Sequence, residues 1–386
     1  MLGLELKKMI KSRILFVLCV SLLILFAGRV LILYKGIPDS SAAKSMKNFK
    51  KADRLNNTVL NDEINLIAEK AFSSDDSNGS YYRTKYLAYS EVIKSRSYVS
   101  TYQDDMKKYI KSLVVQRAEN KKEGKETSQL DKMIDYYNVK RNVETVNDND
   151  FYNYLKLYTM YDYNIYFSVV MMISGAVLFA FVFHEEDIRG MREISLSSCK
   201  GRQTSFCVKF SAVFIVMFML NAGVVMIEFA GGVYRGIYKW SAPIQSISYF
   251  KYCPFSVNIW QYLIITGLLR FFVIITFIGL LLIVDKGSRG IIRCLSAGFL
   301  ISAFCFVLSS PYLNHDNKGY EMVKQIDRLR SICPFCLFMP EYYFEGFDSV
   351  VVLGIPVFRF TTAIISGLII IIMGFIIGLN DKKYLE

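Results

Sequence analysis

The segment "FHEEDIRGMREISLSSCKGRQTSF", Phe183–Phe206, is a polar stretch between two apolar runs. Tyr166–Phe183 before it has no charged residue, and Phe210–Phe229 after it has one, Glu228. Each run approaches the ~20 residues that a helix needs to cross the hydrocarbon core of a bilayer. The two runs therefore predict a pair of membrane spans joined by a polar connection at the membrane surface.

The composition of the whole chain agrees with a membrane protein. Of 386 residues, 53% are hydrophobic and the mean hydropathy is +0.29, above the ~45–50% apolar content of soluble domains. The net charge of +12 suits either nucleic acid or an anionic membrane surface. The apolar runs favour the membrane, and the nearly balanced charges of residues 35–164 argue against a nucleic-acid partner.

The distribution of apolar runs predicts an all-α polytopic membrane protein with six transmembrane helices. The predicted spans are 14–34, 165–183, 209–229, 259–284, 291–309 and 359–379. The first run is long and lacks a small-residue cleavage site, so we interpret it as a retained anchor rather than a signal peptide.

Lysine and arginine near the ends of the spans favour cytoplasmic N- and C-termini in the cell membrane. The cytoplasmic segments would be an interfacial helix at 1–13, a connection at 184–208, a short loop at 285–290 and the tail 380–386. The extracytoplasmic segments would be 35–164, 230–258 and 310–358, the last with re-entrant or short helices.

The segment 35–164 is far longer than an ordinary connection. Apolar residues recur at helical spacing in 55–72 and 86–116, and a third helix is expected near 130–143. We therefore expect a large helical insertion between the first and second spans. It contains no cysteine, so packing alone would hold it together.

The opening segment is predicted to be an amphipathic helix, "EEDIRGMREISLS", followed by a turn at "CKGRQ". Three acids at its start suit the positive end of a helix dipole. Such a helix would lie on the inner membrane surface and present residues to a cytoplasmic partner.

These residues resemble the ABC-2 type transporter permeases. The shared pattern is an acid four residues before a glycine, a stretch ending in small hydroxyl residues, a Gly-Arg pair and a lysine at the next span, here Glu186, Gly190, Ser197, Ser198, Gly201, Arg202 and Lys209. The opening "ELKKMIKSR" is similar to that family's N-terminal interfacial helix, and the resemblance extends over the whole plan of the chain.

The resemblance implies a half-transporter whose 184–208 segment is a coupling helix. That helix would dock in a groove of a separate ATPase subunit, and a second permease chain, identical or homologous, would complete the pathway. The residues it assigns to coupling are Glu185, Glu186, Gly190, Met191, Arg192, Ser197, Gly201 and Arg202. No cofactor is expected on this chain, because "KKEGKETS" lacks the spacing of a phosphate-binding loop. ATP and Mg²⁺ would bind the partner ATPase.

Three charged residues are candidates for the translocation pathway: Arg270, Glu228 and Arg29. A charge within a span usually faces a cavity or a partner, so Arg270 could line a cavity or form an ion pair. Alternatively, the span begins after Arg270 and the residues before it form an interfacial helix. Glu228 could pair with either arginine, and Arg29 lies close enough to the membrane surface to snorkel.

The remaining motifs predict little chemistry. Cys333 and Cys336, spaced C-x-x-C in an extracytoplasmic loop, could form a local disulfide, whereas zinc would call for a second such pair. His184 and His315 are weak candidates for metal or catalytic roles, and no catalytic motif is evident. We expect no metal site and no enzymatic activity in this chain.

The resemblance therefore implies the membrane subunit of a bacterial ABC exporter, and family habit together with the apolar outer loops suggests an amphipathic peptide, lipid or antimicrobial compound as substrate. The partners would be the ATPase, the second permease chain and membrane lipids. The alternative hypothesis is a membrane-anchored sensor or immunity protein that binds an extracellular ligand and transports nothing.

Overall fold

The architecture is that of a computed structural model of the chain. It describes all residues except 1, 4–6, 8–11, 13–16, 18, 29–47, 49–50, 53, 74–76, 141–142, 144, 146–160, 189–200, 235–238, 286–290, 310–328, 331, 348, 353–354 and 381–386.

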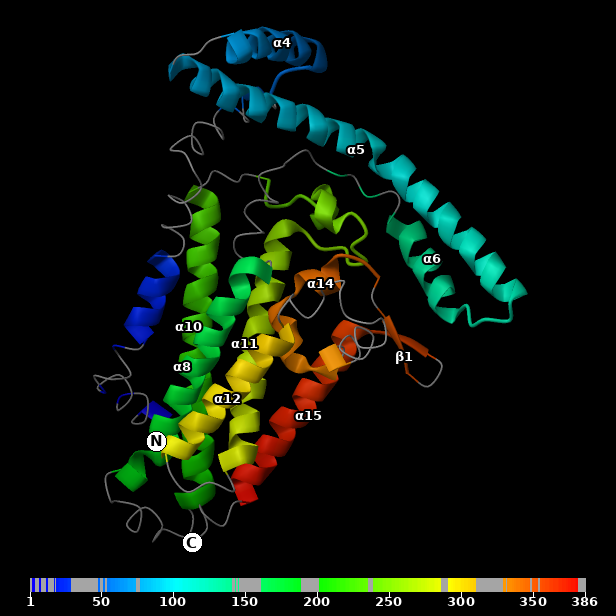
Figure 1. Ribbon diagram of the computed structural model, residues 1–386. Coiled ribbons are helices and arrows are strands. Elements are labelled where there is room, and N and C mark those ends of the chain that lie inside the picture. Colours follow the sequence, from blue (N-terminus) through cyan, green and yellow to red (C-terminus); the bar gives the residue numbers. More distant parts are fainter. Residues whose placement is uncertain are drawn as a thin grey trace.

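A bundle of long helices forms one part of the molecule (Figure 1). Its members are α8 (Tyr161–Ile188), α10 (Gly201–Tyr234), α11 (Ile259–Asp285), α12 (Ile291–Ser309) and α15 (Arg359–Asn380). A shorter apolar helix, Cys19–Gly28, packs on α10, where Leu23 Cδ2 lies 3.0 Å from the position that a Cβ on Gly223 would occupy.

In the described part of the chain, four helical segments are long and apolar enough to cross a membrane. They are Thr204–Val233, Ile259–Asp285, Ile291–Leu308 and Arg359–Asn380. Shorter apolar helices, Cys19–Gly28 and Ser168–His184, overlap the first two predicted spans. The four long segments correspond to the last four predicted spans, and six crossings remain a prediction.

Small residues set the spacing of the bundle. A Cβ added to Gly374 of α15 would overlap the backbone of Gly279 in α11, and one added to Gly298 of α12 would lie 2.7 Å from Ala176 Cβ in α8. Such contacts allow helix backbones to approach closely, which is how helices associate where lipid removes the hydrophobic driving force.

The outer faces of the bundle are covered by large apolar side chains. Those at least half exposed include Met219, Met226, Phe299, Leu300, Phe304, Ile369, Ile372 and Met373. A soluble monomer rarely exposes a contiguous apolar surface of this extent. The same surface is well matched to lipid, so the faces of α10, α12 and α15 agree with a bilayer around the bundle.

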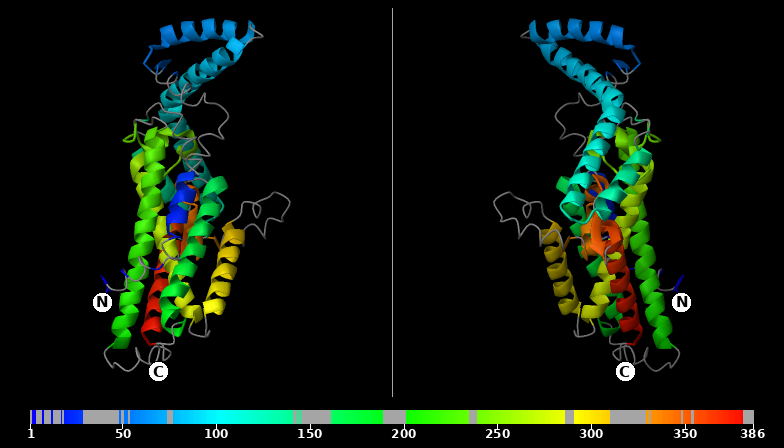
Figure 2. Two further views of the ribbon diagram at one scale, coloured as in Figure 1. Left: turned by 90° about the vertical axis from the view of Figure 1, so that its left-hand side faces the viewer. Right: turned by 90° about the vertical axis from the view of Figure 1, so that its right-hand side faces the viewer.

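In a second part, the α4–α6 layer, α4 and the start of α5 lie beyond one end of the bundle and α6 lies beside that end (Figures 1 and 2). It comprises α4 (Asn57–Ser73), α5 (Ser77–Lys122) and α6 (Ser128–Lys140). Two apolar clusters hold it together. One joins α4 to α5 through Leu60, Ile67, Tyr89 and Val92, and the other joins α5 to α6 through Tyr102, Met106, Ile110, Leu113, Ile134 and Tyr137.

The helix boundaries in this layer follow from local chemistry. Asn56 Oδ1 accepts a hydrogen bond from the N–H of Val59 at 3.0 Å and caps α4. The helix expected over 86–116 is longer at both ends: it begins at Ser77, and it continues to Lys122 because residues 117–122 are mostly good helix formers. It ends at Lys122, and the φ of +67° at Gly124 allows the N–H of Lys125 to donate to the Asn120 carbonyl at 2.9 Å.

Short elements close the bundle at the end that faces the α4–α6 layer. They are η1 (Ile244–Ser246) and η2 (Ser248–Phe250) before α11, then η4 (Pro334–Phe338), α14 (Glu341–Phe344), β1 (Ser349–Val352) and β2 (Ile355–Phe358) before α15. All residues of η4 are buried, and it contacts α11, α12 and α15.

The strands β1 and β2 form an antiparallel pair, with Ser349 opposite Phe358 and Val352 opposite Ile355. This corrects the expectation that the protein is all-α, whereas η4 and α14 are short helices of the kind expected in 310–358. The valine run in β1 and the isoleucine and valine of β2 favour a pleated strand over a helix.

Candidate functional site

An ion pair is buried inside the bundle between α10 and α11. Arg270 donates to both carboxylate oxygens of Glu228, with Nη2–Oε1 at 3.0 Å and Nη1–Oε2 at 3.5 Å. Both side chains are less than 5% exposed. A charge buried in the apolar interior is costly unless a partner and hydrogen bonds compensate it, and this two-point contact supplies both.

The ion pair is one of two buried polar contacts described between α10 and α11. Two turns along α10 from Glu228, Asn221 Nδ2 donates to the carbonyl of Gly267 at 2.9 Å, and both ends of this contact are buried. Gly267 also leaves no room for a side chain, because a Cβ there would lie 2.5 Å from Val225 Cγ2 of α10. Glycine at this position therefore brings Arg270, one turn further along α11, within reach of Glu228.

Of the two sequence interpretations of Arg270, the structure shows the ion-paired one. The helix is continuous from Ile259 to Asp285, so Arg270 lies within a span rather than before one. Glu228, which the sequence left open between two arginines, contacts Arg270. Arg29, the third pathway candidate, lies outside the described residues. A role for these residues in translocation stays a prediction.

The predicted coupling residues lie at the other end of the bundle, around the connection between α8 and α10. Glu185 and Glu186 are in the last turn of α8, and Gly201 and Arg202 begin α10. The turn predicted at 199–203 is thus wrong for its last residues, which are helical. Gly190, Met191, Arg192 and Ser197 lie outside the described residues, so their coupling role remains a prediction.

The base of this connection carries a buried polar cluster that sequence reasoning missed. His184 of α8, Asp285 of α11 and Cys294 of α12 are each at most 2% exposed. Their ligand-type atoms lie within 4.8 Å of one another, and His184 Nε2 is 3.2 Å from Asp285 Oδ1. The sequence offered one signal: Asp285 is an acid at the end of an apolar span, at a position where basic residues are usual.

Cys333 and Cys336 are free thiols in the structure, at the start of η4. A hydrogen bond between them lowers the pKa of Cys333 and raises that of Cys336, since it favours the thiolate at the accepting sulfur. Cys336 is buried and Cys333 is half-buried. A local disulfide between them stays a prediction.

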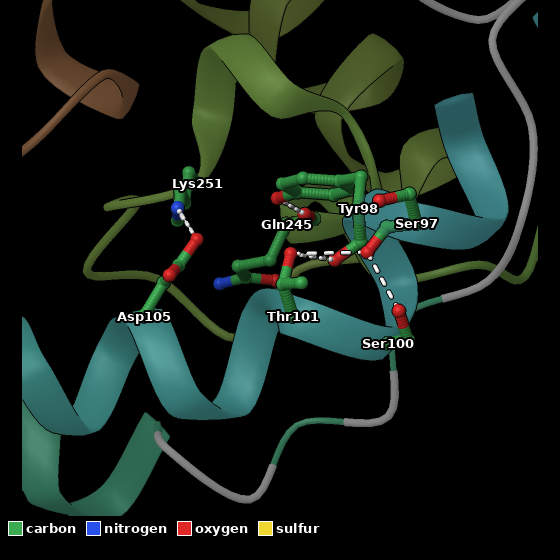
Figure 3. A network of polar contacts seen from close by, with 7 residues as sticks. All are labelled: Ser97, Tyr98, Ser100, Thr101, Asp105, Gln245 and Lys251. Atoms are coloured by element: carbon green, nitrogen blue, oxygen red, sulfur yellow. Dashed lines mark hydrogen bonds and ion pairs between the residues drawn. The ribbon is translucent and has the colours of Figure 1, made fainter.

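The α4–α6 layer is fastened to the bundle by hydrogen bonds to the connection between α10 and α11. Tyr98 Oη donates to the Gln245 carbonyl at 2.6 Å, and Lys251 Nζ lies 2.7 Å from Asp105 Oδ2 (Figure 3). The Lys251 ammonium holds the pKa of Asp105 below its ordinary value. Burial raises the pKa of Tyr98, so its phenol remains protonated and able to donate.

A second set of hydrogen bonds joins α6 to the connection between α10 and α11 and to the connection between α12 and α15. Tyr137 Oη donates to the Tyr252 carbonyl at 2.9 Å and accepts from the N–H of Phe347 at 3.1 Å. Lys132 Nζ donates to the carbonyl of Pro356 in β2. The layer is therefore bound to both short-element regions that close the bundle.

The long apolar helices, their lipid-matched faces and the buried ion pair define a multi-pass membrane protein. A family model described as "ABC-2 family transporter protein" matches residues 13–380. The chain therefore belongs to this family and is a permease component of an ABC transporter. No curated protein and no solved structure matches the chain closely enough to count as a relative.

Proposed function

We propose that this chain is a half-transporter that exports an amphipathic substrate, driven by a separate ATPase that docks on residues 184–208. Two such chains, identical or homologous, complete the pathway. The observation that carries the proposal is the buried Arg270–Glu228 pair within a membrane-spanning bundle. Ionisable groups at this depth are costly to keep and are usually functional.

The helix α10 offers a mechanical route from the docking segment to this pair. It is one helix of 34 residues, Gly201–Tyr234, whose first residues belong to the docking segment and which includes Glu228. At ~1.5 Å per residue, about 39 Å of helix separates Arg202 from Glu228. A rigid element of this kind converts a small tilt at one end into a displacement at the other.

The arrangement supports a latch. In the structure Glu228 and Arg270 hold α10 against α11. An ATPase that moves the start of α10 would separate the two charges and open the seam between the helices, where the polar end of an amphipathic substrate could replace one partner. Re-formation of the pair would close the seam and drive the substrate outward.

Co-purification tests the docking step. We expect a nucleotide-binding protein to co-purify with the tagged wild-type chain and to be lost from Glu186→Ala and Gly190→Leu. The matched control is Glu119→Ala, an exposed acid on α5 in the α4–α6 layer. If both variants retained the ATPase as well as the control does, the docking assignment would be wrong.

The same preparation separates transport from sensing. In proteoliposomes with the ATPase, we expect ATP-dependent movement of a labelled amphipathic peptide or lipid, and a loss of that movement in Glu228→Gln with ATPase binding intact. A chain that binds such a ligand equally well with and without ATPase and nucleotide, and moves none of it, would instead be the sensor or immunity protein.

A further inference from the structure

We infer that His184, Asp285 and Cys294 form a binding site for a divalent transition metal, with Zn²⁺ as the ion that suits them best. The site goes beyond the proposed transport function and does not depend on it. It lies at the base of the connection between α8 and α10, where three helices meet.

Helix packing brings the three side chains together. Ala176, Ala180 and His184 follow one another at four-residue spacing along α8, and all three are buried. Gly298 of α12 lies against Ala176, with 2.7 Å between Ala176 Cβ and a Cβ placed on the glycine. Cys294 lies one turn before Gly298, so the close approach of α12 to α8 directs its thiol toward His184.

The geometry fits a tetrahedral ion. Zinc is usually four-coordinate, with bonds of about 2.0–2.3 Å to nitrogen, oxygen and sulfur ligands. Two ligands at about 2.0 Å from a tetrahedral centre are about 3.3 Å apart, and His184 Nε2 is 3.2 Å from Asp285 Oδ1. The thiol completes a set in which all donor atoms lie within 4.8 Å of one another.

The charges fit a divalent ion as well. A bound metal would have a neutral imidazole, a carboxylate and a thiolate as ligands, because metal ligands must be deprotonated. Two negative charges and one divalent cation sum to zero, which matters where each group is at most 2% exposed and net charge is costly. The mixed nitrogen, oxygen and sulfur set suits zinc better than magnesium or calcium, which prefer oxygen ligands.

A metal at this place would tie the end of α8 to the end of α11 and the start of α12. His184 directly precedes Glu185 and Glu186 in α8. The ion would therefore fix the position from which the connection between α8 and α10 begins.

Cobalt titration of the purified wild-type chain in detergent, without ATPase, tests the site. Cobalt replaces zinc in such sites and reports a thiolate ligand by a near-ultraviolet charge-transfer band. We expect this band to saturate at one Co²⁺ per chain and to disappear when Zn²⁺ is added. Absence of a saturable thiolate band in the wild-type chain would overturn the proposal, whatever the behaviour of any variant.

Variants identify the ligands. We expect Cys294→Ser to abolish the charge-transfer band, and His184→Ala and Asp285→Asn to weaken binding by more than the ~10–100-fold typical of removing a hydrogen-bond partner of a metal ligand. The matched control is Cys305→Ser, a buried cysteine three turns along α12, which should bind as the wild type does. Persistence of the band in Cys294→Ser, or its loss in Cys305→Ser, would show that the metal binds elsewhere.

Discussion

The α4–α6 layer and the bundle are both helical, but they place their polar groups differently. In the layer, tyrosines keep their rings in apolar clusters and donate from their hydroxyls to loop carbonyls, as Tyr98 and Tyr137 do. In the bundle, glycines and alanines line the helix contacts, and the buried charges of Glu228 and Arg270 meet each other.

The difference reflects the two surroundings. At the surface, water competes for each polar group, so one hydrogen bond contributes about 0.5–1.5 kcal/mol. Inside an apolar bundle no water replaces a lost partner, and an uncompensated charge costs several kcal/mol. The comparison therefore predicts that breaking a polar contact lowers the free energy of unfolding more in the bundle than in the layer. Substitutions can test that prediction.

The largest effect is expected at the buried ion pair. Arg270→Met would leave the Glu228 carboxylate buried without its arginine and lower the free energy of unfolding by about 3–5 kcal/mol. The double variant Glu228→Leu/Arg270→Met should recover most of that loss, because two apolar groups need no partner. Denaturant titration in detergent micelles measures both.

The matched comparison is Lys251→Met, which breaks a partly exposed pair of the layer. Exposed pairs contribute about 0–1 kcal/mol, so this variant should be nearly neutral. Equal losses in Arg270→Met and in the double variant, or a loss at Lys251 as large as that at Arg270, would contradict the contrast between the regions.

The next effect is expected where helix backbones touch. Any side chain at position 374 overlaps backbone atoms of Gly279, and a backbone cannot rotate aside as a side chain can. Gly374→Ala should therefore force α15 away from α11 and lower stability by about 1–3 kcal/mol. The shift in thermal unfolding temperature of the purified protein measures it.

Gly175→Ala provides the control for this prediction. Its Cβ would meet Met217 Cε at 3.6 Å, an ordinary contact, and alanine is the better helix former. We expect no loss of stability, or a slight gain. If Gly374→Ala and Gly175→Ala had the same thermal unfolding temperature, small-residue packing would not be what sets the spacing of α11 and α15.

The sequence predicted the long helices of the bundle well and their mutual contacts poorly. The run 259–284 corresponds to α11, and 359–379 to α15, each within a residue, because the thickness of a bilayer fixes the length of an apolar run. The pairing of Glu228 depended on how α10 and α11 pack. Gly267, one turn before Arg270, was the available signal for close packing.

The other differences have physical causes of the same kind. The sequence alone makes His184 a weak metal candidate because its neighbours Asp285 and Cys294 come from helices distant in sequence. The strands β1 and β2 were missed because a short valine-rich run resembles a piece of a membrane helix until its pairing partner is known. Local patterns thus identified elements, whereas the candidate sites arise from contacts between them.

A smaller effect is expected where the layer meets the bundle. Tyr137→Phe removes a hydroxyl that donates to the Tyr252 carbonyl and accepts from the Phe347 N–H. Losing both bonds should lower the local stability of α6 by about 1–2 kcal/mol, and Tyr98→Phe, which loses one bond, by about 1 kcal/mol.

Hydrogen–deuterium exchange of the α5 and α6 amides measures these changes, because local opening governs their exchange rates. Tyr81→Phe, at an exposed tyrosine of α5, should leave the rates unchanged. Equal protection of α6 in Tyr137→Phe and in the wild type would mean that apolar contacts alone hold α6 in place.

The smallest effect is the pH dependence of the Asp105–Lys251 pair. Lys251 lowers the pKa of Asp105 in the folded protein, so the pair stabilises the fold above the ordinary aspartate pKa of about 3.9. That contribution falls away as the pH drops through the lower folded pKa. Since Asp105 is 36% exposed, solvent screening keeps the effect to a few tenths of a kcal/mol.

The measurement is the difference in α5 stability between the wild type and Asp105→Asn, taken at several pH values in detergent. We expect the wild type to be slightly more stable at pH 6 and the difference to shrink below pH 4. A difference independent of pH would assign the effect of the substitution to packing rather than charge. In the bundle, the corresponding Glu228→Gln substitution should cost several times more at pH 6, because no water screens that pair.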